Sequence, residues 1–280
     1  MTDVLGPVAF ALVCWWFGTG AVLWLVRRPA GRFPLIRLLG TLVLVLSLFT
    51  TQVSMSDQGV AHAYLGFASV ILMWAWHELA FLTGWITGTR RVPLSAGAQG
   101  WQRFAESTRV VIWHELALLA NFLVLLVMQQ GQPSHVALCT FSILWCMRLS
   151  AKLNLFVGVP EVGEQYLPAH LRFLASYFRQ RRLGAFFWLS VGGATLIWFW
   201  ILREGADAGE SLSVGWVLLA SLLGLAILEH ILMAFPAPVQ KLWSWAMARD
   251  GPQDMRGRMD ELTPVSPVVA VAKPGKAPPL

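Results

Sequence analysis

The chain has 280 residues, of which 56% are hydrophobic and 13% charged, and its mean hydropathy is +0.60. Soluble domains average about 25% charged residues, so this composition excludes an ordinary soluble domain and favours a membrane protein. The formal net charge of +6 comes without a basic helix or motif that would read a nucleic acid, so nucleic-acid binding is not expected.

Seven apolar stretches predict seven transmembrane helices, because about 20 apolar residues cross a hydrocarbon core of about 30 Å. In chain order they cover residues 4–26, 35–53, 61–86, 110–128, 135–156, 183–202 and 213–235. The predicted fold class is therefore all-α, a polytopic membrane helix bundle within residues 1–245.

Basic residues are concentrated in the connections after the first, third and fifth stretches and in the segment after the seventh. By the positive-inside rule, this bias predicts that the N-terminus is outside and the C-terminus cytoplasmic. Residues 167–182 combine Leu, Phe and Tyr with several Arg, and we expect an interfacial amphipathic helix there. Residues 246–280 end in a run rich in Pro, Ala and Val, which predicts a largely disordered cytoplasmic tail.

Three of the apolar stretches each contain a histidine next to a glutamate. The pairs are His77-Glu78, His114-Glu115 and Glu229-His230. An ionisable residue inside a membrane span is costly and usually faces the bundle interior or a cavity. At about 1.5 Å per residue, all three pairs fall in the cytoplasmic half of the bundle or near its middle. We therefore predict that they share one polar site.

Further polar residues lie at similar depth in the fifth stretch. Arg148, Lys152 and Asn154 are the predicted charge partners of the glutamates, because a cation inside a span pairs with a carboxylate or extends to the interface. The sequence Trp-His-Glu-Leu-Ala occurs at 76–80 and again at 113–117, which indicates a paired role for the third and fourth helices.

The chemistry of the predicted site stays open at this point. Carboxylates and imidazoles together suit iron, manganese or zinc, so all six residues of the three pairs are candidate metal ligands. A neutral histidine also ligates haem iron or the magnesium of a chlorin, which makes His77, His114 and His230 candidate cofactor ligands. A proton relay uses the same residue types. In a purely structural alternative, each glutamate only pairs with a histidine, Arg148 or Lys152.

Several stretches of the chain resemble one family. They are WWFGTG at 15–20, HELAFLTGWITGTRR at 77–91, WHELALL at 113–119, and SAKLNLFVGVPEVGEQYLP at 150–168 with HLRFLASYF at 170–178. Together they are similar to the photosynthetic complex assembly protein 2 family (PuhE-like) of phototrophic bacteria, over nearly the whole chain except the tail. The resemblance implies a multi-pass protein of the bacterial inner (photosynthetic intracytoplasmic) membrane.

Two functions fit the resemblance together with the polar residues. In the first, which the resemblance favours, the protein is a non-enzymatic factor for assembling reaction-centre and light-harvesting subunits or for supplying bacteriochlorophyll. In the second, it is a di-iron-like membrane metalloenzyme that oxidises or modifies a Mg-tetrapyrrole intermediate. The expected partners are the lipid bilayer, photosynthetic subunits and a tetrapyrrole pigment, and no residue is assigned a catalytic role.

Overall fold

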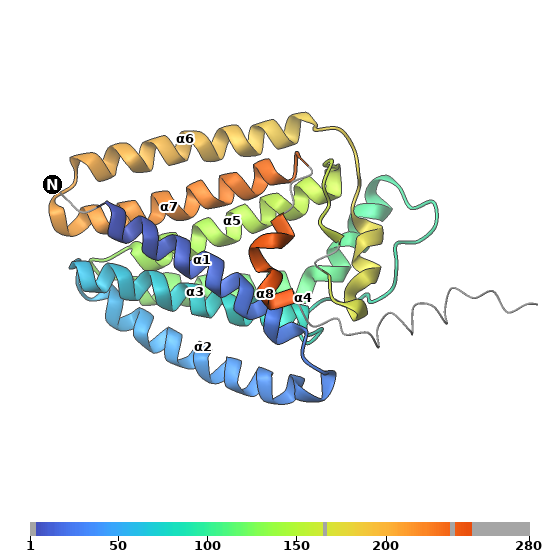
Figure 1. The fold of residues 1–280 in the computed structure, drawn as a ribbon, viewed down its shortest axis with the longest axis horizontal. Helices are drawn as coiled ribbons and strands as arrows, with labels where there is room; N and C mark the ends of the chain where they lie inside the picture. The colour runs from blue at the N-terminus through green and yellow to red at the C-terminus, as the bar shows by residue number, and fades with distance from the viewer. Residues whose placement is uncertain (1–3, 165–166, 236–238, 248–280) are drawn as a thin grey trace, which may run out of the picture.

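The computed structural model describes residues 4–164, 167–235 and 239–247. This part of the chain contains seven helices that are long and apolar enough to cross a membrane. They are α1 (Leu5–Val26), α2 (Phe33–Met55), α3 (Val60–Leu82), α4 (Gly100–Met128), α5 (Val136–Val157), α6 (Ala185–Asp207) and α7 (Glu210–Leu232). The shorter helices are η1 (Ala30–Arg32), η3 (Ala169–Tyr177), η4 (Val239–Trp243) and α8 (Ser244–Met247). The predicted all-α polytopic bundle is confirmed (Figure 1).

Helix α3 lies at the centre of the bundle and packs against α1, α2, α5 and α7. Helices α2 and α6 form opposite edges (Figure 1). Both edge helices expose large apolar side chains, including Phe49 on α2 and Leu196 on α6. Such faces suit contact with lipid, which supports a multi-pass membrane protein.

The connection between α3 and α4 is the main departure from the predicted helix limits. Helix α3 ends at Leu82 and α4 begins at Gly100, so the third helix is shorter and the fourth longer than predicted. Gly84 follows α3 with φ of +69°, a left-handed conformation that ends helices. The connection then runs back along α4, where the Thr87 carbonyl accepts from the His114 amide at 3.0 Å. A Cβ on Gly88 would lie 2.0 Å from the Arg109 carbonyl oxygen, so this approach requires glycine.

One half of the bundle is tightly packed, and we call it the closed half. It holds the ends at which α1, α3, α5 and α7 begin, and its core includes Met55, Phe67, Ala137 and Phe141, each at most 1% exposed. Small and hydroxylated residues let the helices approach there, as membrane helix interfaces commonly do. For example, the Thr51 and Ser69 hydroxyls of α2 and α3 lie 3.0 Å apart in a hydrogen bond.

The opposite end of the bundle is covered by the segment after α5, which differs from the predicted helix over 167–182. The helical part is a 3-10 helix, η3, limited to Ala169–Tyr177. Its Leu174 and Tyr177 are buried against the bundle, and the Tyr177 hydroxyl donates to the Val92 carbonyl at 2.9 Å. The residues after η3 cannot continue a helix because the Val159 amide and carbonyl pair with Arg179 and Arg181. The predicted tail at 246–280 lies almost wholly outside the described residues.

Candidate functional site

A cavity of about 780 Å³ lies inside the bundle, in the half opposite the closed half. Helices α1, α3, α4, α5 and α7 form its walls, and residues from 161–163, η3 and η4 contribute to its lining. Most of the lining is apolar or aromatic, with a few charged side chains among it. Binding pockets for small molecules have volumes of about 300–1,000 Å³ and this kind of lining.

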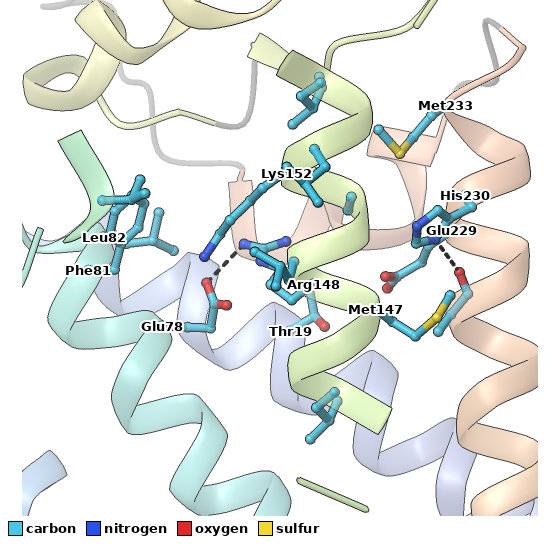
Figure 2. Close-up of a pocket in the computed structure, with 18 of the residues that line it drawn as sticks. Thr19, Glu78, Phe81, Leu82, Met147, Arg148, Lys152, Glu229, His230 and Met233 are labelled. Carbon is cyan, nitrogen blue, oxygen red and sulfur yellow. Dashed lines mark hydrogen bonds and ion pairs between the residues drawn. The ribbon is translucent and has the colours of Figure 1, made fainter. Parts of the chain in front are cut away.

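The three glutamates of the predicted site all line this one cavity. Glu78 on α3 pairs with Arg148 on α5, with Oε2 and Nη2 3.0 Å apart. Glu115 on α4 pairs with Lys152 on α5 at 2.5 Å. Figure 2 shows Arg148 and Lys152 on α5, Glu78 on α3 and Glu229 on α7 around the cavity.

Glu229 differs from the other two glutamates because it has no ion pair among the described residues. Its Oε1 accepts a hydrogen bond from the Trp15 indole at 2.6 Å, and the side chain is exposed at the cavity. The charges of all three glutamates act on Arg148, so they belong to one electrostatic group. Three carboxylates face two cations within the spans, so among the described residues Glu229 has no cation in direct contact and shares the charge of Arg148 with Glu78.

Of the three predicted histidines, only His230 lines the cavity. Its Nδ1 lies 2.9 Å from the Ala226 carbonyl and its Nε2 lies 3.0 Å from the Ser150 hydroxyl. A carbonyl only accepts, so Nδ1 carries the proton and the Ser150 hydroxyl donates to Nε2. Both ring nitrogens of His230 are therefore occupied by protein groups.

His77 and His114 lie away from the cavity lining, in the packed interior. They are 2% and 1% exposed, and their ring centroids are 6.4 Å apart. Among the described residues, no hydrogen-bond partner is present for either ring nitrogen of His77 or for Nδ1 of His114. Adjacent residues on a helix point about 100° apart, so turning Glu78 and Glu115 into the cavity turns these histidines away from it.

The predicted metal ligands are not gathered around one point. In the described parts of the chain, no group of three or more His, Cys, Asp or Glu is placed to hold a metal ion. The six-residue metal site therefore stays a prediction. Asn154, predicted as a charge partner, instead donates to the Ser150 carbonyl at 3.0 Å and to the Ser190 hydroxyl at 3.3 Å.

Three residues that complete the site were not predicted from the sequence. Trp15 binds Glu229, Ser150 binds His230, and the Trp145 indole donates to Glu115 Oε2 at 3.2 Å. Helical spacing could have indicated Trp145, because positions 145, 148 and 152 lie on one face of a helix. Trp15 belongs to a motif that supported the family resemblance, but nothing local in the sequence connects it to α7.

Comparison with known proteins places this bundle in a family. Residues 1–254 match the family described as "Protein of unknown function (DUF3623)". The chain is 38% identical over 238 residues to a protein of Rhodobacter capsulatus described as "Uncharacterized 30.4 kDa protein in puhA 5′ region", covering 83% of this chain and 87% of that protein. No solved structure matches the chain. The match over nearly the whole bundle shows that this protein belongs to the DUF3623 family.

Proposed function

We propose that this protein is an integral membrane factor that binds bacteriochlorophyll or a related magnesium tetrapyrrole while reaction-centre and light-harvesting complexes are assembled. The observation that carries this proposal is the cavity of about 780 Å³, with apolar walls and a few charged groups, inside a membrane bundle. A tetrapyrrole is a large, flat, mainly apolar molecule with a small number of polar atoms, and the lining has the same balance.

The polar groups of the cavity match those of such a ligand. The Arg148 side chain is 44% exposed, and its guanidinium has more N–H groups than Glu78 occupies. These free donors suit the carbonyl oxygens at the rim of a bacteriochlorin ring. The ion pairs Glu78–Arg148 and Glu115–Lys152 keep most of the lining electrically balanced, which suits a ligand without a large net charge.

A photosynthetic setting is supported by the relative in Rhodobacter capsulatus, whose description places it in the puhA 5′ region. The resemblance to photosynthetic complex assembly proteins points the same way. A partner role for reaction-centre or light-harvesting subunits is part of the proposal, since handing over a pigment requires a recipient.

The proposed location is the bacterial inner membrane, with the cavity end of the bundle towards the cytoplasm. The motive is the distribution of arginines, which are frequent at the cavity end and rare at the other. Reporter fusions within 89–109 should therefore report the cytoplasm, and fusions within 129–134 should report the periplasm. The opposite pattern would mean that the bundle is inserted the other way round, with the cavity end towards the periplasm.

Pigment binding is tested by titrating the purified protein, in lipid nanodiscs, with bacteriochlorophyll a. We expect a shifted pigment absorption band and saturation at one pigment per chain, with Kd of about 1 μM or tighter. Ala75→Phe places a ring at the cavity lining and should weaken binding about tenfold or more. Leu196→Phe on the exposed face of α6 is the matched control and should bind like the wild type.

Two outcomes would contradict the proposed function. Binding that is equally strong in the Ala75→Phe variant would place the pigment outside the cavity. Absence of pigment binding together with stoichiometric iron in the purified protein would favour the metalloenzyme that the sequence analysis left open.

A further inference from the structure

Resting on the proposed function, we infer that Glu229 is the residue that would hold the magnesium of the tetrapyrrole, through its carboxylate. From the sequence, we expected a histidine in this role. The structure assigns it to a glutamate because both ring nitrogens of the cavity histidine are already used in hydrogen bonds, whereas one carboxylate oxygen of Glu229 is not.

Among the described residues, neither of the other two glutamates of the spans has a carboxylate oxygen that is both free of a hydrogen bond and open to the cavity. Glu115 Oε1 bonds to Lys152 and its Oε2 bonds to Trp145. Glu78 Oε2 bonds to Arg148, and its Oε1 is buried without a partner, where no ligand in the cavity can reach it. Each of these two carboxylates is also neutralised by its cation, which lowers its attraction for a metal centre.

The single cavity histidine is also occupied. The ring nitrogen of His230 that carries the lone pair accepts from the Ser150 hydroxyl, and the other donates to the Ala226 carbonyl. His230 is 2% exposed, and a metal could bind its Nε2 only after the hydrogen bond from the Ser150 hydroxyl is broken. Hydrogen bonds of this kind fix the orientation of the ring, so His230 is a structural neighbour of the site.

Glu229 has the properties that the others lack. Among the described residues, only its Oε1 has a hydrogen-bond partner, the Trp15 indole, and the carboxylate is exposed at the cavity without an ion pair. Magnesium is a hard cation that prefers oxygen ligands, including carboxylates. A carboxylate without a direct ion pair is costly to keep ionised in an apolar cavity, and coordination to magnesium would stabilise its ionised form. Trp15 holds the carboxylate in place and is a positioning residue.

Glu161 also lines the cavity, but from the connection after α5. Its amide bonds to the Met233 carbonyl, beyond the last residue of α7, so it lies at the end of the cavity and not on its helical wall. It is therefore the competing carboxylate of the same cavity, and Glu161→Gln tests it against Glu229.

The test compares two pigments that differ at the metal, bacteriochlorophyll a and the magnesium-free bacteriopheophytin a. The wild type should bind the magnesium pigment about tenfold more tightly, or better, than the metal-free one. Glu229→Gln keeps the shape and the Trp15 contact but weakens the metal ligand, so the preference should fall to about threefold or less. Its affinity for bacteriopheophytin a should not fall. Glu161→Gln should keep the wild-type preference.

The outcomes separate this inference from the function on which it rests. A wild type that binds both pigments equally overturns the role of Glu229 and leaves the pigment site standing. Binding of neither pigment overturns both. Loss of the preference in Glu161→Gln and not in Glu229→Gln assigns the metal to Glu161 and contradicts the inference. The wild-type preference itself needs no variant, so a failure of Glu229→Gln to fold still leaves a decisive measurement.

Discussion

The two halves of this bundle are built from the same helices but differ in what lies between them. In the closed half, side chains such as Phe141 and Met55 pack the interior, and hydroxyls such as those of Thr51 and Ser54 bond to nearby oxygens. In the other half, the same helices surround a cavity lined by carboxylates, cations and aromatic rings. The closed half holds the helices together, which leaves the cavity half able to keep space and charge that do not serve packing.

The free-energy cost of placing charged groups inside the membrane also indicates that the cavity half serves a function other than packing. Ionisable groups at membrane depth are expensive, even when they are paired, and replacing a buried ion pair by apolar residues often stabilises a protein. Two ion pairs and an uncompensated glutamate on one cavity are therefore poorly explained by stability. A ligand that interacts with them gives a reason for keeping them.

The largest expected difference between the halves is in the free energy of unfolding when an alanine is replaced by phenylalanine. Ala137 is 1% exposed and packs in the core with Met55 and Phe141, so Ala137→Phe should lower the free energy of unfolding by about 3 kcal/mol. Ala75→Phe, at the cavity lining, should change it by less than about 1 kcal/mol. Unfolding in mixed detergent micelles measures both variants. Equal losses would mean that the cavity half is packed like the closed half.

A smaller effect is expected from breaking one ion pair of the cavity. Lys152→Met leaves the Glu115 carboxylate without its cation, and we expect a loss of about 1–2 kcal/mol because both side chains are only partly exposed, 23% and 20%. The double variant with Glu115→Gln should recover most of that loss, since no charge is left unpaired. The same unfolding assay measures this cycle. Additive losses in the double variant would show that the two residues do not interact.

The smallest effect is expected at the buried histidines. His77 has two nitrogens without a partner, so His77→Leu removes an unsatisfied polar group at little change of volume. Its free energy of unfolding should stay within about 1 kcal/mol of the wild type, and it should bind bacteriochlorophyll a normally. A strong loss of binding would show that His77 belongs to the functional site after all.

The helices and the similar depth of the glutamates were predictable because both depend on properties that the sequence carries directly. Length and hydropathy located each span, and counting residues along helices put Glu78, Glu115 and Glu229 at compatible depth. In the structure all three line one cavity. The fold class and the shared depth thus follow from one-dimensional information.

The orientation of side chains around each helix axis was not predictable in this way. Whether His77 or Glu78 faces the cavity depends on how α3 is rotated against five neighbouring helices, α1, α2, α4, α5 and α7. The bond between Trp15 and Glu229 joins residues 214 positions apart, so it depends on how α1 and α7 pack. The end of η3 at Tyr177 follows from the backbone pairing of Val159 with Arg179 and Arg181, which the amphipathic pattern does not reveal.

Pigment binding inside the cavity is tested most directly by a cryo-EM structure of the protein loaded with bacteriochlorophyll a in a lipid nanodisc. We expect density for one flat macrocycle among α1, α3, α5 and α7, with its magnesium next to the Glu229 carboxylate and Arg148 near a ring carbonyl. A macrocycle held on the lipid-facing side of α2 or α6, with the cavity occupied by lipid, would contradict it.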